Sequence, residues 1–502
     1  MLAWTIYLSF AGALVQALLP KGRNGLARWL ALATAAAGLV LAIGGFAAGA
    51  ANHYALTTVV DVPWVPSMGI HYTLAADGIS LVLVLVTGLA AVAGVLFSWN
   101  IDQRTNEFFA FYLALIGGVY GVFLSFDLFL LFVFYEIAIV PKYFLIAIWG
   151  STRREYGAMK LALYSFVGSA MVLIGLLAAY AESGSQSTGI VALANAGLPV
   201  SFQMWCFPLV FVGFAILAGM WPFHTWAPTG HVAAPTAASM LLAGVVMKLG
   251  AYGCLRVAMT VFPHGMDPWG FTLLGLGSWR EVFALLAVIG IVYGALVALV
   301  QSDFKFVIGY SSVSHMGFVL LGLMTLKQIG MTGAVLQMFS HGILAGLLFA
   351  IVGRIVYERT HTRQLAELEG MHLSKRLPFA AWAFVIAGMA AMGLPGFSGF
   401  IAEFQVLAGA WQAKPWWTLA AGVGIVVGVA YTWRALQKAF FSDHTPAAHV
   451  HDHDHVLAAV TWPEVTGVCM LLGASLWVGL YPRILLDAIE PAVKTLLAGG
   501  AR

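Results

Sequence analysis

Long apolar runs constrain the fold of this chain more than any other feature of its sequence. Each run continues for about 20 residues, the length that an α-helix needs to cross the hydrocarbon core of a bilayer. The runs are continuously apolar and do not alternate with period two, which excludes a transmembrane β-barrel. Hydrophobic residues make up 61% of the 502 residues and charged residues 9%, against about 25% charged in an ordinary soluble domain. A soluble enzyme, a disordered chain and a nucleic-acid-binding protein are therefore excluded, and the lipid bilayer is the expected solvent.

The apolar runs predict an all-α polytopic membrane protein with about fourteen transmembrane helices. The expected spans are 2–20, 27–49, 78–98, 107–125, 127–149, 157–180, 205–226, 236–258, 281–302, 306–326, 330–356, 378–411, 416–440 and 463–483. The longest gaps between spans lie near 50–77, 181–204 and 357–377, and we expect loops there. The chain divides into N-terminal helices (1–106), two five-helix units (107–258 and 281–440) and a C-terminal region (441–502) with a His-rich loop and the last helix.

The basic residues predict how the chain is oriented in the membrane. Alternate loops, including the one with Lys305, collect 15 of the 24 Lys and Arg residues, and the opposite loops, including the one with Arg256, carry seven. The positive-inside rule puts the first set in the cytoplasm. Both termini then lie on the outer side of the membrane. Positive charges follow the first apolar run instead of preceding it, so we interpret that run as a span and not as a signal peptide.

Two spans are expected to be broken helices. The seventh runs into 218-AGMWPFHTWAPTGHVAAPTAAS-239 with three prolines, and the twelfth contains 392-MGLPGFSGFIAEF-404 with Pro395 among glycines. Proline removes a backbone donor, and in lipid such a break persists only where protein or water satisfies the freed groups. Broken helices five spans apart indicate two inverted five-helix repeats, as in secondary transporters. The alternative is that both are kinked packing helices.

A few ionisable residues fall inside the expected spans. Charge at bilayer depth is costly, so these residues are functional candidates. They are Glu136, Lys142, Lys248 and Glu403, with His224, His231, His315 and His341 as groups that titrate near neutral pH. We interpret the set as a path for protons or cations, the alternative being buried ion pairs that only fix helix packing. Lys142 could instead snorkel to the membrane surface, and Asp77 and Asp127 at span edges could face water or cap helices.

No metal or cofactor site is expected in this chain. Cys206, Cys254 and Cys469 lie singly in apolar runs, so we interpret them as packing residues without a disulfide or metal role. The loop 444-HTPAAHVHDHDH-455 has five histidines and two aspartates that could ligate a metal, but their irregular spacing argues against a fixed site. Motifs for flavin, iron–sulfur clusters or quinone do not occur.

Several of these stretches resemble a known family. Residues 75-AADGIS-80, 127-DLFLLFVFYEIAIVPKYFLIAIWG-150, 222–239, 301-QSDFKFVIGYSSVSHMGFV-319 and 392–404 are similar to the antiporter-like membrane subunits of bacterial NADH-quinone oxidoreductase, respiratory complex I. The wider group includes the D subunits of multisubunit sodium/proton antiporters. The forms 357-YERTHTR-363 and 311-SSVSHMG-317 favour the M type over the L and N types.

The resemblance implies a proton-translocating subunit of the membrane arm, without a redox centre of its own. L-, N- and K-like membrane subunits would be its partners, and protons would pass from the cytoplasmic side by Lys248 to Glu403. The alternatives are a subunit of a sodium/proton antiporter or a membrane-bound hydrogenase, and a structural spacer that does not pump.

The resemblance also assigns roles to single residues. Glu136 matches the family's gating glutamate, Lys248 its central lysine and Glu403 its terminal acid, and the path histidines match His224, His315 and His341. One position departs from the family, which usually has a lysine where this chain has Leu217. Lys142 stands where the family typically has an uncharged residue. We hypothesise that the Lys142 amine projects toward the gap at Leu217 and restores a Glu–Lys pair with Glu136.

Overall fold

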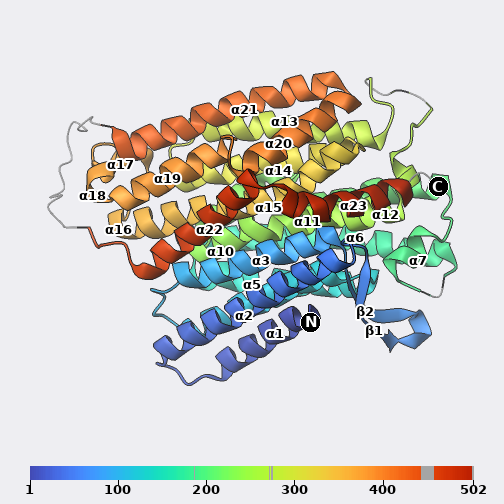
Figure 1. Ribbon diagram of the computed structural model, residues 1–502, viewed down its shortest axis with the longest axis horizontal. Helices are drawn as coiled ribbons and strands as arrows, with labels where there is room; N and C mark the ends of the chain where they lie inside the picture. Colours follow the sequence, from blue (N-terminus) through green and yellow to red (C-terminus); the bar gives the residue numbers. More distant parts are fainter. Residues whose placement is uncertain (186, 271, 273–274, 443–456, 500–502) are drawn as a thin grey trace.

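The computed structural model describes residues 1–502 except 186, 271, 273–274, 443–456 and 500–502. Most helices run along the long axis of the molecule and form a bundle (Figure 1). One end of the bundle, which we call the hairpin end, carries the strands β1 (Thr57–Val65) and β2 (Ile70–Ala76), the short helix α7 (Ile190–Ala194) and the C-terminus. The opposite end, which we call the basic end, carries three short helices, namely α16 (Glu358–Thr360), α17 (Leu365–Leu368) and α18 (Leu373–Arg376).

The N-terminal part consists of three long helices and a hairpin. The helices are α1 (Ala3–Leu18), α2 (Asn24–Ala51) and α3 (Gly78–Phe97). The prediction of a plain loop at 50–77 was wrong, because β1 and β2 pair there in antiparallel fashion from Thr57↔Ala76 to Val65↔Ile70, joined by η1 (Pro66–Met68). The stretch TTVVDVPWV is rich in β-branched and aromatic residues, which favour strands.

The first half of the bundle contains the expected broken helix. Its elements are α4 (Thr105–Leu124), α5 (Leu128–Trp149), α6 (Arg154–Ser183), α8 (Val200–Ala218), η2 (Phe223–Thr225), α9 (Trp226–Ala233), α10 (Thr236–Leu241), η3 (Leu242–Val246), α11 (Met247–Gly253), η4 (Cys254–Ala258), α12 (Met259–Val261) and η5 (Pro263–Met266). The interruption falls between α8 and η2, at the prolines that predicted it. The stretch from α10 to α12 is a buried span in which two π-helical segments, η3 and η4, flank α11.

The second half repeats this order of helices. Its elements are α13 (Trp279–Val300), α14 (Phe304–Met324), α15 (Gln328–Ala350), η6 (Ile351–Tyr357), α19 (Pro378–Ala391), α20 (Ser398–Ala413), α21 (Pro415–Leu436) and η7 (Gln437–Phe441). The second predicted break lies between α19 and α20. In both halves the interrupted helix is therefore the fourth long element. That the halves are inverted repeats, and the domain limits given above, stay predictions.

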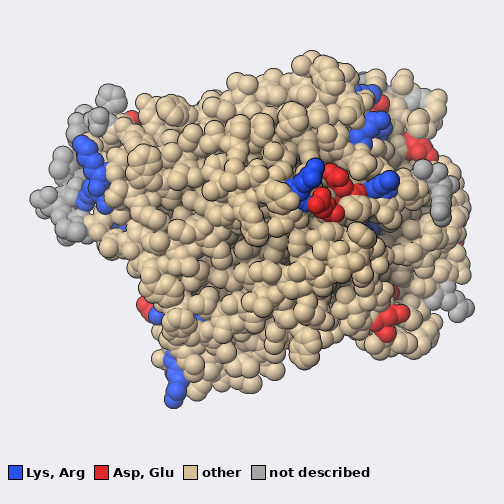
Figure 2. Space-filling view, viewed as in Figure 1, with Lys and Arg blue, Asp and Glu red and all other residues tan. Residues whose placement is uncertain are grey.

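The C-terminal region adds α22 (Trp462–Leu480) and the unpredicted helix α23 (Arg483–Gly499). Helix α23 is amphipathic, with buried apolar residues such as Leu485 and Val493 on one face. Its exposed face carries Arg483, Asp487, Glu490 and Lys494. Because of these charges, α23 contains no long apolar run, and a prediction based on apolar runs does not find this helix. In Figure 2 a band of charge lies where Figure 1 shows α23, within an otherwise largely uncharged face.

The structure supports a polytopic membrane fold but not an exact number of spans. Among the described residues, twelve helices are long and apolar enough to cross a membrane. The other two expected spans correspond to α1 and α19, which are shorter apolar helices, α19 being one part of the broken twelfth span. The count of about fourteen stays a prediction. Asp77 and Asp127, at span edges, accept hydrogen bonds from the first backbone amides of α3 and α5 and so cap these helices.

Candidate functional site: a buried polar axis

Lys248 lies in the middle of one of the two fully buried spans found among the described residues. It belongs to α11, and its side chain is fully buried. π-Helical segments are frequent at functional sites because they reorient side chains and free backbone groups. Here the Lys248 Nζ donates to the carbonyl of Ala243 in η3 and lies 2.6 Å from Nδ1 of His341. The π-helical segment therefore provides a backbone acceptor for a lysine that has no carboxylate beside it in the described part of the chain.

His341 connects Lys248 to the second half of the bundle. Its ring stacks on that of His315 from α14, with 5.4 Å between the ring centroids. The Nε2 atom of His315 lies 3.4 Å from Oε1 of Glu403, which α20 presents just after the helix break. Lys248, His341, His315 and Glu403 come from four helices and form one row of successive contacts. We call this row the polar axis.

Hydroxyl and amide groups line the Glu403 end of the polar axis. Gln337 Nε2 donates to Glu403 Oε1 at 3.3 Å, and Tyr431 donates to Ser311 Oγ at 2.8 Å, beside His315. Two cavities of about 10 Å³ each are lined by both His315 and Glu403. His341 also lines one of the two. Such a volume holds about one water molecule, so a water can bridge neighbouring groups here.

Glu136 and Lys142 lie on α5, away from the polar axis. Lys142 is fully buried, and its Nζ has no hydrogen-bond partner among the described residues, which argues against snorkelling. The two side chains form no ion pair with each other in the described structure. Lys142 follows Tyr135 by seven residues, almost two helical turns, so both occupy the same face of α5. Because Tyr135 packs edge-on against Phe214 of α8, this face is directed toward the helix that carries Leu217.

A cavity of about 180 Å³ opens at the basic end of the bundle and contains a lysine that we had assigned to a loop. This is Lys305, which is buried in the first turn of α14 and donates to the carbonyl of Ala234 at 3.1 Å. Glu358 lines the same cavity. The sequence carries a signal for this position. Asp303, two residues before Lys305, caps α14, so Lys305 falls within the first turn of the helix.

His231 is a further buried histidine outside the polar axis. It is fully buried in α9, and neither ring nitrogen has a well-aligned hydrogen-bond partner among the described residues. Its ring stacks on that of Phe349 from α15, with 4.8 Å between the ring centroids. His231 is one of the titratable groups that the sequence places inside a span.

His224, a predicted site residue, is not part of the polar axis. It is buried in η2, and its ring lies edge-on to Tyr293 with 5.1 Å between centroids. His224 therefore lies beside the break in the first half.

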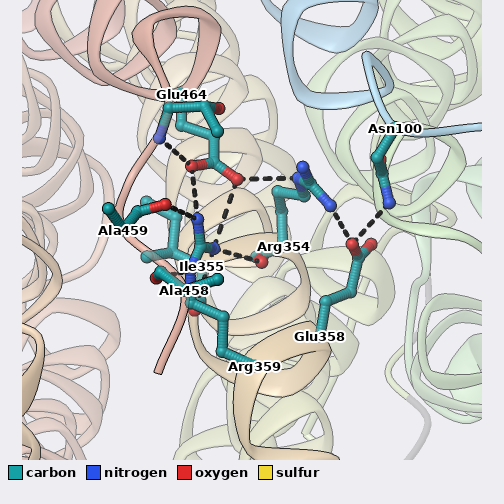
Figure 3. Close-up of polar contacts among 9 residues, drawn as sticks. Asn100, Arg354, Ile355, Glu358, Arg359, Ala458, Ala459 and Glu464 are labelled. Carbon is teal, nitrogen blue, oxygen red and sulfur yellow. Dashed lines mark hydrogen bonds and ion pairs between the residues drawn. The ribbon is translucent and has the colours of Figure 1, made fainter. Parts of the chain in front are cut away.

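A network of ion pairs fixes α22 at the basic end (Figure 3). The buried carboxylate of Glu464 pairs with Arg354 Nε at 2.8 Å and with Arg359 NH2 at 2.8 Å. Arg354 also pairs with Glu358, which accepts from Asn100 at 2.6 Å. Glu358 thereby belongs both to this network and to the wall of the cavity that contains Lys305.

No metal-binding cluster of three or more His, Cys, Asp or Glu residues occurs in the described part of the chain. The His-rich loop 444–455 lies outside the described residues. Cys206 and Cys254 are buried within helices and Cys469 is exposed, and all three are free.

The chain is similar to known proteins over almost its whole length. Residues 125–428 match the family model described as NADH:quinone oxidoreductase/Mrp antiporter, TM. NADH-quinone oxidoreductase subunit M of Rhodobacter capsulatus is 36% identical, over 98% of this chain and 95% of its own length. NAD(P)H-quinone oxidoreductase chain 4 1 of Synechococcus sp. (strain JA-3-3Ab) is 37% identical, over 93% of this chain and 87% of its own length.

Solved structures show the same fold. A chain in respiratory complex I from Thermus thermophilus with bound NADH superposes with a TM-score of 0.86 at 26% identity, covering 99% of this chain and 100% of that chain. A chain in the Mrp complex from Dietzia sp. DQ12-45-1b gives a TM-score of 0.84 at 21% identity, covering 99% of this chain and 97% of that chain. At this lower identity the likeness shows the fold alone.

Proposed function

Because the chain belongs to the family of membrane subunits of NADH:quinone oxidoreductases and Mrp antiporters, we propose that it conducts protons in the membrane arm of a complex I-like oxidoreductase. Its relatives are the antiporter-like subunits M and 4, so it is a subunit of the M type. The observation that supports conduction through this chain most directly is the unbroken row of contacts from Lys248 through His341 and His315 to Glu403. Oxidation of NADH takes place in other subunits, and this chain contributes the proton path.

The path begins in the cavity at the basic end, which we expect to face the cytoplasm. A proton reaches Lys305 there and passes by His231 to Lys248. A buried amine can release its proton when another positive charge approaches, and can bind one again when that charge leaves. Imidazole rings carry a proton between two nitrogens, which suits His341 and His315 for the transfer to Glu403.

Glu136, Lys142 and His224 belong to the first half of the bundle and act before Lys248. Since Leu217 cannot titrate, we propose that Lys142 supplies the amine of this half. Its burial without a hydrogen-bond partner among the described residues supports the role, because a buried charge is costly and persists only with a function.

The chain works with other membrane subunits, and we propose that these are L-, N- and K-like. The assembly lies in a bacterial inner membrane with both termini of this chain on the periplasmic side, which matches the excess of basic residues at the basic end. We propose no cofactor or metal for this chain. A sodium/proton antiporter subunit remains the second candidate because the Mrp chain has the same fold.

The test is proton pumping by the assembled complex in inside-out membrane vesicles. Lys248→Ala removes the central amine, and Lys438→Ala, which loses only a partly exposed pair with Glu369, is the matched control. We expect Lys248→Ala to lose most proton uptake and the control to keep it. A fully assembled Lys248→Ala complex that pumps normally would show that the chain is a spacer. Proton uptake that requires sodium would instead favour the antiporter reading.

A further inference from the structure

Four buried side chains meet on the hairpin side of Lys248. Arg256 in η4 pairs with Asp77, the cap of α3, at 2.5 Å, and its Nε donates to the Tyr252 hydroxyl at 3.2 Å. The Tyr252 hydroxyl lies 3.1 Å from Ser80 Oγ and donates to the carbonyl of Phe123 at 3.1 Å. The Asp77 carboxylate also accepts from the Ser80 amide at 3.0 Å. We call these four residues the arginine cluster.

Two members of the arginine cluster, Asp77 and Arg256, form the floor of a cavity that opens at the hairpin end, and Tyr252 and Ser80 lie behind them. The cavity measures about 330 Å³ and lies beneath α23. Exposed residues such as His53, Leu56 and Thr495 line its mouth, and the buried Asp77 and Arg256 line its inner part. Solvent that enters from this side therefore reaches the ion pair.

Lys248 lies directly behind this floor. Lys248, Tyr252 and Arg256 follow at intervals of four residues along one helical stretch, so the cluster begins one turn from the lysine and ends about 12 Å along the helix. The Lys248 ammonium points the other way, toward Ala243 and His341.

The arginine cluster differs chemically from the polar axis. Among the described residues, its side chains leave no buried polar atom without a partner, whereas His341 Nε2, Lys142 Nζ and both nitrogens of His231 lack one. Unpartnered nitrogens are free to bind a water or a proton. A guanidinium does not deprotonate in proteins, so Arg256 cannot pass a proton on. Its fixed positive charge, held over the rings of Phe126 and Tyr252, repels hydronium as arginines do in other pores.

We propose that the Arg256–Asp77 pair is a barrier that keeps protons on Lys248 from escaping to the hairpin-end cavity. Asp77 holds the guanidinium in place, and Tyr252 and Ser80 fill the space where water would otherwise connect Lys248 to that cavity. Protons are thereby forced along His341 and His315. This inference rests on the proposed proton path. It adds to that path the residues that prevent protons from leaking from Lys248 directly to the hairpin end.

The experiment measures passive proton leak in proteoliposomes that contain the assembled complex, with a potassium diffusion potential and no NADH. Asp77→Asn/Arg256→Gln removes both charges together, so neither is left buried alone. We expect the leak to rise at least threefold and the ratio of protons pumped to NADH oxidised to fall, with quinone reduction retained. If the double variant assembles poorly, Tyr252→Phe is measured in its place, because it removes one hydroxyl of the cluster and makes room for water there.

Two further variants make the result specific. Arg280→Gln changes another hairpin-end arginine, which donates to the carbonyls of Met324 and Thr325 and has no part in the cluster; it should not leak. Adding Lys248→Met to the leaking variant should abolish the leak, because the escape starts from that lysine. An assembled double variant with normal coupling, or a leak that survives Lys248→Met, overturns the barrier. Neither outcome resembles failure of the proposed function, which is normal pumping by Lys248→Ala.

Discussion

The Lys248 ammonium lies 2.6 Å from Nδ1 of His341, and no carboxylate comes within ion-pair distance of it among the described residues. The central amine of the span is thus joined to an imidazole and not to a counter-ion. A carboxylate would hold the proton on the lysine by charge attraction, whereas an imidazole can accept it. Whether Lys248 is protonated therefore depends on charges farther along the bundle.

Replacing His341 should break the polar axis at its second group. His341→Gln keeps a hydrogen-bonding side chain beside Lys248 but cannot take up the proton. We expect a loss of proton pumping similar to that of Lys248→Ala, measured by dye quenching in inside-out vesicles. Since both residues serve one path, the double variant should be no worse than either single variant. Additive losses would show that the two residues act separately.

We expect proton pumping to depend on the ability of Glu403 to bind and release a proton and not on its hydrogen bonds. Glu403→Gln keeps the size of the side chain and an oxygen that can accept from Gln337, but it cannot ionise. Loss of a positioned acid or base typically costs about 100-fold or more in a proton-transfer step, so pumping should fall below detection. Glu403→Asp, one methylene shorter, should retain part of the activity. Equal pumping by Gln and Asp variants would contradict the role.

Glu464 should be important for stability because it ties α22 to η6 and α16. Glu464→Gln leaves Arg354 and Arg359 without their shared carboxylate, and breaking a buried pair from one side typically costs about 3–5 kcal/mol. We expect a clearly lower thermal unfolding midpoint of the purified complex. Glu490→Gln on the exposed face of α23 is the control and should change stability by less than about 0.5 kcal/mol. An unchanged midpoint for Glu464→Gln would mean that the network contributes little.

The features of the fold that depend on a local sequence pattern could be predicted from the sequence. Run length located the long helices, and the prolines at 222 and 395 located both breaks, because each signal acts within one helix. The helix α23 was missed because its polar face lowers the hydropathy of the window. Arg256 was assigned to a loop, but it is buried because Asp77, 179 residues away, pairs with it. The burial of Lys305 was missed for the same reason, since only the folded bundle brings the carbonyl of Ala234 to its amine.

The lysine on α5 offers the sharpest test of how this chain departs from its relatives. Lys142→Met removes a buried amine for which the described residues offer no hydrogen-bond partner, so the variant should fold well and lose pumping. Adding Leu217→Lys puts an amine on α8, toward which the Lys142 face of α5 is directed, and should restore pumping in the Lys142→Met background. The single variant Leu217→Lys tests whether two amines in one half are tolerated, and we expect it to pump less because like charges repel when both are buried. If Lys142→Met pumps normally, the amine on α5 is structural and the first half of the bundle needs no lysine.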